Sequence, residues 1–256
     1  MAKDAPHVGL LVTCLVDLMR PSIGFAAVRL LEAAGCVVAV PLTQTCCGQP
    51  AHNAGDRRTA QAIAGDVIRA FEGFDYVVVP SGSCAAMVRR HFPTLFDDDA
   101  AMADRATALA RRTFELTAFL VDVMGEAGTA ATFEGTVAYH DSCSALRELG
   151  IREQPRKLLG AVAGLGLREP EDAEACCGFG GMFCVKYAGI SDAMVAKKVR
   201  AIAASGADTV VSADLGCLLQ IAGSLARQGP AMRVRHVAEL LAGMTEGPAI
   251  GEPAED

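Results

Sequence analysis

The sequence predicts an α/β protein made of two related halves, each with a parallel sheet and flanking helices. Apolar runs of strand length alternate with longer segments of helical periodicity, which is the order that a parallel sheet requires. Two adjacent cysteines followed by glycine occur twice, at Cys46-Cys47-Gly48 and at Cys176-Cys177-Gly178. Hydrophobic residues make up 52% of the 256 residues, against 21% charged ones, which is enough for cores of ordinary domain size.

The first half contains three predicted strands. They are expected at residues 7–12, 36–40 and 76–79. Helices are expected at residues 22–34 and 56–71, from Cys84 onward, and as one long helix over 100–124. Ser22 is expected to cap the first of these helices, and Gly35 stands where a left-handed residue would end it.

The second half repeats this order. Strands are expected at residues 136–140, 165–168, 209–212 and 233–235. Helices are expected at residues 154–163, from a cap at Ser191 to Gly206, from Cys217 onward, and at 237–244. Residues 125–135 are small and polar, so we expect domains at 1–126 and 127–256, with a flexible tail over 244–256.

Each vicinal cysteine pair has one further cysteine upstream and one downstream. The first set is Cys14, Cys46, Cys47 and Cys84, and the second is Cys143, Cys176, Cys177 and Cys217. The upstream separations are 32 and 33 residues, and the downstream ones are 37 and 40. The groups follow predicted strands, so the thiols should gather beyond the C-terminal strand ends, where open α/β sheets place ligands. We interpret the pattern as one four-thiolate module, duplicated.

Four converging thiolates can hold an iron–sulfur cluster or a structural zinc ion. Zinc sites usually draw their ligands in pairs from short CxxC knuckles, whereas these spacings are long and the paired cysteines are adjacent. This favours iron and sulfide. The glycine after each pair allows a tight turn that brings amide N–H groups toward inorganic sulfides. Adjacent cysteines form a disulfide only with strain, since their Cα atoms are ~3.8 Å apart.

Several classes of protein do not fit the sequence. The net charge of −7 and the lack of a basic run do not fit nucleic-acid binding. The apolar run 8–16 is too short to span a bilayer and has no basic leader, so we expect a cytoplasmic protein with reduced thiols. No G-x-G-x-x-G fingerprint follows a strand and no P-loop is present, so no flavin or nicotinamide site is expected.

Other residues near the cysteine loops carry weaker signals. Cys36 lies in a predicted strand and is expected to be a small buried hydrophobe. Cys184 could touch a cluster or act as a redox thiol. His52 and His140 are either donors to a cluster or ordinary hydrogen-bonded loop residues. The lysines at 186, 197 and 198 form either a positive rim around the second site or a solvated helix face.

The repeated order of cysteines resembles the cysteine-rich CCG domain, which occurs in the B subunit of heterodisulfide reductase and in the iron–sulfur subunit of glycolate oxidase. The stretches 46–51, 80–84 and 176–183 look closer to the lactate utilization protein A family, over about residues 7–244. This resemblance implies two tandem Rossmann-like domains and a cytoplasmic, electron-transferring iron–sulfur subunit that helps to oxidise L-lactate to pyruvate. It also implies two partner subunits, a ferredoxin-type iron–sulfur protein and a third small protein.

One departure from the family pattern limits what the resemblance implies. In heterodisulfide reductase the module ends in CxxC, and five cysteines hold a noncubane cluster. Here Ser81 and Asp214 replace the first cysteine of that pair, so a [4Fe–4S] cubane in each half fits better, and either residue could add an oxygen ligand. A zinc-binding scaffold, a thiol–disulfide reductase and a glycolate-oxidising subunit are the alternatives.

Overall fold

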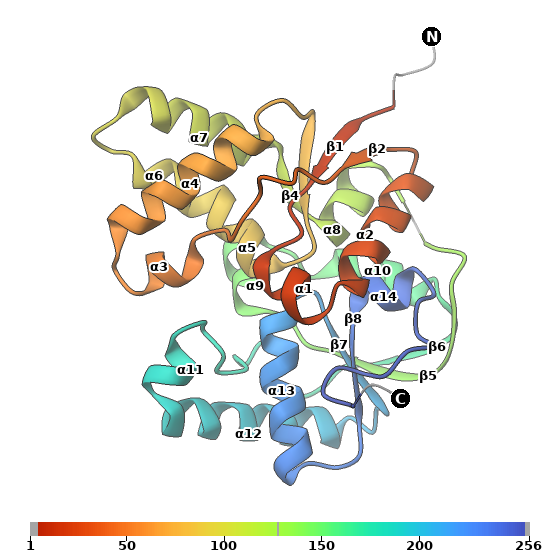
Figure 1. The fold of residues 1–256 in the computed structure, drawn as a ribbon. Coiled ribbons are helices and arrows are strands. Elements are labelled where there is room, and N and C mark those ends of the chain that lie inside the picture. Colours follow the sequence, from red (N-terminus) through yellow and green to blue (C-terminus); the bar gives the residue numbers. More distant parts are fainter. Residues whose placement is uncertain (1–4, 127, 254–256) are drawn as a thin grey trace.

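A computed structural model describes residues 5–126 and 128–253 and contains two parallel four-stranded sheets (Figure 1). The strand order is β2-β1-β3-β4 in the first sheet and β6-β5-β7-β8 in the second. Every strand pair in both sheets is parallel. The second sheet therefore repeats the first, with β5–β8 in the places of β1–β4. The predicted α/β fold with two related sheets is confirmed.

The first sheet and its helices come from the first half of the chain. The strands are β1 (His7–Leu10), β2 (Val37–Ala39), β3 (Tyr76–Val79) and β4 (Thr113–Glu115). The helices are α1 (Cys14–Met19), α2 (Ser22–Ala33), α3 (Gln49–Asn53), α4 (Arg57–Phe71), α5 (Gly82–Ala86), α6 (Phe92–Leu95), α7 (Ala100–Arg112) and α8 (Leu116–Ala118). Two π-helical turns, η1 (Met87–His91) and η2 (Phe119–Val123), extend α5 and α8.

The second half builds the other sheet from the same succession of strands. The strands are β5 (Thr132–Tyr139), β6 (Ala163–Arg168), β7 (Thr209–Ser212) and β8 (Arg233–His236). The helices are α9 (Cys143–Leu149), α10 (Glu153–Gly160), α11 (Phe183–Lys186), α12 (Ala188–Ala204), α13 (Leu215–Gln228) and α14 (Val237–Leu241). Among the residues that the structure describes, no helix is long and apolar enough to cross a membrane.

The long helix expected over residues 100–124 is wrong. Helix α7 ends at Arg112, and the next three residues form β4, which pairs in parallel with β3 from Val77↔Thr113 to Val79↔Glu115. Helix α8 then starts from Glu115, whose side chain accepts hydrogen bonds from the amides of Thr117 and Ala118. Pairing with a buried strand overrides a helical pattern that runs through the segment.

Two predicted helix caps are also wrong, because both serine side chains bind elsewhere. Helix α2 begins after Pro21, and the Ser22 hydroxyl donates to Glu239 Oε1 at 2.6 Å. Helix α12 already begins at Ala188, and the buried Ser191 hydroxyl donates to the Gly178 carbonyl at 2.8 Å. Both hydroxyl groups therefore link segments that are far apart in the sequence.

The polar segments around the second half contain a strand and contacts that the sequence did not predict. Strand β5 begins at Thr132, inside the region predicted as a linker. The segment after Met244, expected to fray, packs back on the second sheet. The amide of Ile250 donates to the Val234 carbonyl at 2.8 Å, and the side chain of Ile250 is buried.

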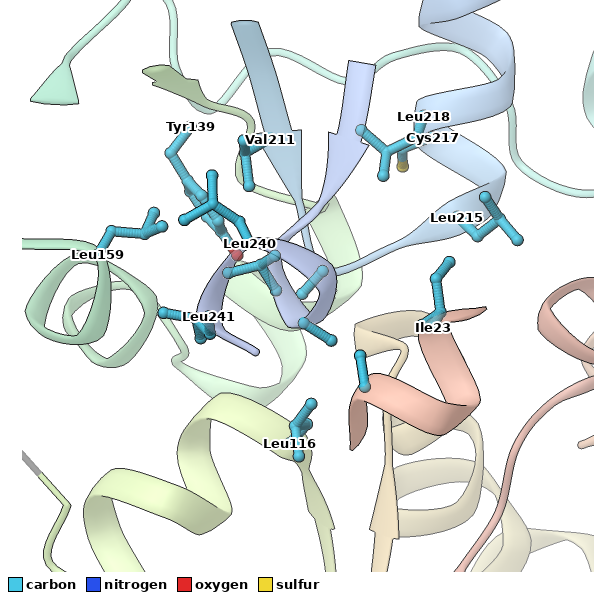
Figure 2. Close-up of a cluster of buried hydrophobic side chains, with 14 of the residues drawn as sticks. Ile23, Leu116, Tyr139, Leu159, Val211, Leu215, Cys217, Leu218, Leu240 and Leu241 are labelled. Atoms are coloured by element: carbon cyan, nitrogen blue, oxygen red, sulfur yellow. The ribbon is translucent and has the colours of Figure 1, made fainter. Parts of the chain in front are cut away.

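The main hydrophobic core is shared by the two halves. It joins residues of β1 and α2 to residues of β5, β7, α13 and α14. Figure 2 shows Ile23 of α2 in one cluster with Leu215, Leu218, Leu240 and Leu241 of the second half. Each fully buried aliphatic side chain stabilises the fold by about 1.5–3 kcal/mol. A smaller core on the other face of the first sheet lies among α4, α7 and η1.

The two halves also meet where the strands end. Helix α5 follows β3 in the first sheet, and α9 follows β5 in the second. These two helices pack against each other. A Cβ atom at Gly82 would lie only 2.5 Å from the Ala145 Cβ, so this close approach requires glycine. This contact places the cysteine groups of both halves near one interface.

Candidate metal centres

The first predicted quartet of cysteines comes together beyond the ends of β1 and β3. Cys14 opens α1, the vicinal pair precedes α3, and Cys84 lies in α5. The Cys14 and Cys46 Sγ atoms are 3.6 Å apart, and those of Cys47 and Cys84 are 3.2 Å apart. Contact between the adjacent Cys46 and Cys47 thiols joins these two pairs, so residues up to 70 positions apart in the sequence form one continuous row of four contacting sulfur atoms.

The second quartet has the same arrangement. Cys143 opens α9, and Cys217 lies in the first turn of α13. The Cys176 thiol contacts those of Cys143 and Cys177, and Cys177 in turn contacts Cys217. The order of contacts along this quartet is the same as along the first. All ten cysteines of the chain are free thiols in the structure.

The glycine after each pair has the backbone conformation that the turn requires. Gly48 has φ 80° and Gly178 has φ 82°, a region that side-chain-bearing residues avoid. Each glycine amide donates to the sulfur two residues earlier, at 3.3 Å from Cys46 Sγ and at 3.3 Å from Cys176 Sγ. The predicted amide donors therefore already point at sulfur.

One thiol in each quartet is poised to ionise. A hydrogen bond from the Cys14 thiol, helped by one from Cys47, holds the pKa of Cys46 well below its usual range. The Cys143 thiol, with Cys177, does the same to the pKa of Cys176. Donating to a neighbouring sulfur and burial raise the pKa values of the donors. A bound metal ion would remove the remaining protons, since thiolate is the form that binds metals.

Each quartet lies in a cavity that the other half of the molecule helps to close. The first cavity is lined by Phe179, Met182 and Leu215 of the second half as well as by its own cysteines. The second is lined by Gln49 and His52 of the first half. The segment around Phe179 contributes to both cavities. The two candidate centres therefore share one interface. The walls that the opposite half contributes are largely apolar at the first centre and polar at the second.

Ser81 and Asp214 use their oxygens at this interface. The Ser81 hydroxyl caps α5 by accepting from the Cys84 amide at 3.3 Å. The buried Asp214 carboxylate accepts from the Ser83 amide at 2.8 Å and from the Ser142 hydroxyl at 3.2 Å. Asp214 therefore bridges the two halves. These contacts occupy the oxygens that the sequence suggested as additional metal ligands.

The two cysteines outside the quartets have different surroundings. Cys36 is 7% exposed in the shared core, and its Sγ atom is 3.9 Å from the Met124 sulfur, as expected for a small hydrophobe. Cys184 is half-buried, and its thiol donates to the Gly181 carbonyl at 3.1 Å. That bond holds the Cys184 thiol on its own loop.

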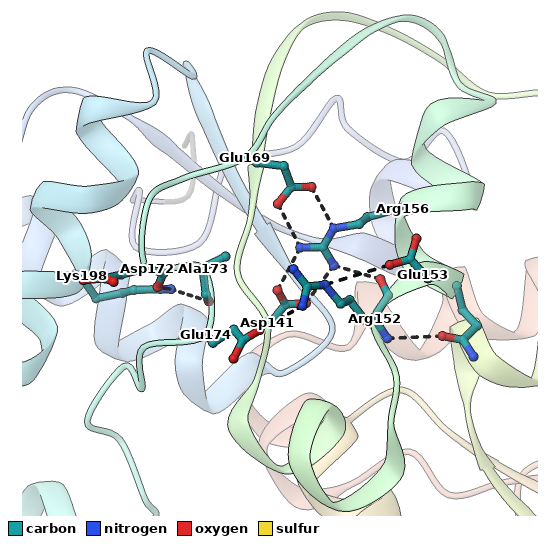
Figure 3. A network of polar contacts seen from close by, with 10 residues as sticks. Asp141, Arg152, Glu153, Arg156, Glu169, Asp172, Ala173, Glu174 and Lys198 are labelled. Atoms are coloured by element: carbon teal, nitrogen blue, oxygen red, sulfur yellow. Dashed lines mark hydrogen bonds and ion pairs between the residues drawn. The ribbon is translucent and has the colours of Figure 1, made fainter.

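Lys198 lies neither on a positive rim around the second site nor on a solvated helix face. It is fully buried, and its ammonium group donates to the carbonyls of Asp172 at 3.0 Å and Ala173 at 2.6 Å (Figure 3). Its neighbour Lys197 is exposed and pairs with the Asp172 carboxylate at 2.9 Å. The periodicity of α12 places residue 198 on the buried face of the helix. Because lysine is charged, the sequence alone indicates a surface position for it.

A partly buried ion-pair network lies next to the second centre and was not predicted. Arg156 binds the Asp141 carboxylate with two hydrogen bonds, of 2.9 and 2.8 Å, and also pairs with Glu169 (Figure 3). Its guanidinium group lies 5.3 Å from the centre of the Tyr139 ring. Because Asp141 stands two residues before Cys143, this network fixes the end of β5 where the quartet begins.

His52 and His140 have different neighbours. His52 follows the first cysteine pair, but its ring contacts that of His91 in a tilted arrangement, 4.6 Å between centroids, and lines the second cavity. His140 is fully buried, and one ring nitrogen lies within 4.8 Å of both the Cys177 and Cys217 sulfur atoms. Neither ring nitrogen of His140 has a hydrogen-bond partner among the described residues. The donor set at the second centre thus extends beyond four thiols.

Comparisons with known proteins agree with this architecture. The model of the CCG family, described as a cysteine-rich domain, matches residues 8–89 and 137–222. The chain is similar to lactate utilization protein A from Exiguobacterium sp., with 48% identity over 238 residues, 92% of this chain and 97% of that protein. It is also similar to lactate utilization protein A from Bacillus subtilis, with 46% identity over 234 residues, 91% of this chain and 98% of that protein.

A solved structure supports the fold alone. The crystal structure of a hypothetical protein from Helicobacter pylori matches with a TM-score of 0.67 at 10% sequence identity. The match covers 96% of this chain and 52% of that protein, so the chain spans about half of its length.

Proposed function

The chain belongs to the cysteine-rich CCG domain family, and from this premise we propose that it is an electron-transferring iron–sulfur subunit of a complex that oxidises L-lactate to pyruvate. The observation that carries the proposal is the convergence of four thiols in each half, at the strand ends where α/β sheets bind ligands. The relatives named lactate utilization protein A support lactate as the substrate.

The residues around each quartet fit an iron–sulfur cluster, which we propose to be [4Fe–4S]. The ligands would be Cys14, Cys46, Cys47 and Cys84 in the first half, and Cys143, Cys176, Cys177 and Cys217 in the second. A bound cluster supplies one-electron storage. The protein contributes thiolates, glycine amides directed at sulfur and walls from the opposite half, which are largely apolar at the first quartet and polar at the second.

We further propose that the substrate-oxidising chemistry depends on partner subunits. These would be a ferredoxin-type iron–sulfur protein and a third small protein, with this chain passing electrons between carriers. The cytoplasm is the compartment that would keep ten cysteines reduced and available to bind iron.

Anaerobic purification followed by iron and sulfide analysis tests this proposal. We expect a brown protein whose visible absorption bleaches on reduction, with iron and acid-labile sulfide in equal amounts. Reconstitution with the partner subunits should give electron transfer from L-lactate in preference to glycolate. A colourless protein that turns over thiols or disulfides alone would contradict the proposal and favour a thiol–disulfide reductase.

A zinc-binding scaffold is the second candidate, and two sulfur–sulfur distances bear on it. A tetrahedral ion with metal–sulfur bonds of about 2.3 Å holds its sulfur ligands about 3.8 Å apart. Two sulfur pairs of the first quartet are near that value, at 3.6 and 3.2 Å. No three sulfur atoms of this quartet lie within 4.8 Å of one another in the described structure, so a single tetrahedral ion would require the other sulfur atoms to move closer. Stoichiometric zinc, without sulfide, in protein purified without oxygen would establish this alternative.

A further inference from the structure

His140 is a buried side chain whose polar atoms face the second centre. It follows β5, and its amide donates to the Val211 carbonyl at 2.8 Å, which fixes its backbone. One ring nitrogen and the Cys177 and Cys217 sulfur atoms lie within 4.8 Å of one another. Both ring nitrogens are without partners among the described residues. Buried polar groups are nearly always hydrogen-bonded, so this ring has unmet bonding capacity next to the sulfur atoms.

The first centre has no such group at the matching position. His140 stands three residues before Cys143, and the residue three before Cys14 is Leu11. Leu11 is fully buried and packs in the core of the first half. The duplicated scaffold therefore carries an apolar side chain at one centre and a hydrogen-bonding ring at the other.

The helices that pack against the two centres, α4 and α12, also carry an apolar side chain at the first centre and a polar one at the second. The glycines after the cysteine pairs face the carbonyls of Ala60 in α4 and Ser191 in α12, which aligns these two helices. In that alignment the buried Lys198 of α12 corresponds to Val67 of α4. The second centre therefore has a buried cation nearby as well as the imidazole, whereas the first has two aliphatic side chains.

We propose, on the premise that both quartets hold iron–sulfur clusters, that His140 donates a ring N–H hydrogen bond to sulfur of the second centre and makes it the centre of higher reduction potential. A hydrogen bond to cluster or ligand sulfur withdraws electron density and favours the reduced, more negative state. An imidazole ring carries at least one N–H in either protonation state, so His140 always has a donor for this bond.

This inequality gives electron transfer within the chain a direction. One electron leaves the reduced first centre, which becomes oxidised, and enters the oxidised second centre, which becomes reduced. No covalent bond to the protein forms or breaks in this step. The electrons would come from L-lactate by way of the partner subunits. The first centre thus accepts electrons and the second delivers them.

A redox titration of the anaerobically purified full chain, followed by electron paramagnetic resonance, tests the proposal. A Cys176→Ser variant removes the second signal and so assigns the two centres. His140→Leu installs the residue of the first half and should lower only the second potential, by about tenfold in the equilibrium constant, or ~59 mV for a one-electron couple. His140→Gln keeps an N–H donor and should stay close to wild type. The matched control Leu11→Met should change neither potential.

The possible outcomes separate this inference from the proposed function. Wild-type protein without iron and sulfide would remove the premise itself. Two intact clusters whose potentials are both unchanged in His140→Leu would overturn the inference and leave the iron–sulfur assignment standing. If His140→Leu loses iron, His140→Gln decides: a wild-type potential supports the hydrogen bond, and a full tenfold shift contradicts it. A coupling to an exchangeable proton at the second centre, lost in His140→Leu, would support it directly.

Discussion

The two halves of the molecule share a scaffold and differ in what surrounds it. Both have the same strand order and the same sequence of sulfur contacts. Around the first quartet the neighbouring buried positions are Leu11 and Val67, whereas around the second they are His140 and Lys198. The duplicated fold therefore fixes where the sulfur atoms lie, and the residues behind them set the chemical properties of each centre.

The two vicinal-cysteine loops differ in reach. The first loop leads directly into α3, at Gln49. The second continues through Phe179, Gly180 and Gly181, with φ 50° and 62° at the two glycines, before α11 begins. This longer loop crosses the interface and lines both cavities. Changes in the second loop should therefore affect the first centre, while the reverse effect should be weaker.

Loss of a ligand should give the largest effect and should separate the two centres. Cys47→Ser and Cys177→Ser should each reduce iron and sulfide to about half of the wild-type content, because thiolate ligation holds each centre and contributes to its folding. Metal analysis of the two purified variants measures this. The control Cys36→Ala should keep full metal content. Complete loss of iron in Cys177→Ser alone would show that the halves do not bind independently.

Glu115 at the end of β4 and His236 at the end of β8 should make the free energy of unfolding depend on pH in opposite directions. Burial raises the pKa of Glu115 from 4.5 to about 6, so its contribution to stability is lost as the pH rises through this range. Burial lowers the pKa of His236 from 6.5 to about 4, so its contribution is lost as the pH falls through that range. The expected contributions to the free energy of unfolding are about 2 kcal/mol for Glu115 and about 3 kcal/mol for His236.

Urea unfolding of the reduced, metal-free protein between pH 4 and pH 7 measures these contributions. Glu115→Gln should reduce the loss of stability above pH 4.5, and His236→Gln should reduce the loss below pH 6.5, each by its own contribution. The buried Asp214 and His140 keep slopes of the same two signs in both variants. Profiles parallel to that of the wild type in both variants would contradict the assignment of these slopes to the two residues.

Alanine at Gly48 and at Gly178 should destabilise the protein to different extents, because one glycine faces a side chain that can move and the other faces a backbone carbonyl that cannot. An added Cβ at Gly178 would meet the Ser191 carbonyl oxygen at 2.7 Å, whereas at Gly48 it would meet the Ile63 side chain at 3.3 Å. Both changes impose a strained φ, at about 1–3 kcal/mol each, and Gly178→Ala should be the more damaging. Thermal unfolding of the metal-free variants compares them, and equal losses would mean that the neighbour does not matter.

The smallest expected effect is at the helix that carries Cys84. Ser81→Ala removes the cap of α5 and should lower the free energy of unfolding by about 1 kcal/mol, with metal content unchanged. Chemical denaturation and iron analysis of the same preparation test this. Loss of the first cluster in Ser81→Ala would instead support an oxygen ligand at this position.

The sequence predicted the parts of the molecule that depend on local pattern. Most strands were identifiable because they are apolar runs, and the quartets because their order repeats. Strand β4 escaped prediction, since three residues in a helical pattern become a strand only by pairing with β3. Lys198 and the Arg156 network also escaped, because a charged side chain is buried only where distant carbonyl or carboxylate groups meet it.

The closing of each cavity by the opposite half has a consequence for biogenesis. During synthesis on the ribosome the N-terminal quartet is complete once Cys84 has emerged, but Phe179 and Leu215, which cover it, are made much later. The C-terminal quartet finds Gln49 and His52 already present when Cys217 emerges. During synthesis the N-terminal site is therefore uncovered for longer, and a metal carrier has more time to reach it. We expect the N-terminal site to be filled first, on the nascent chain.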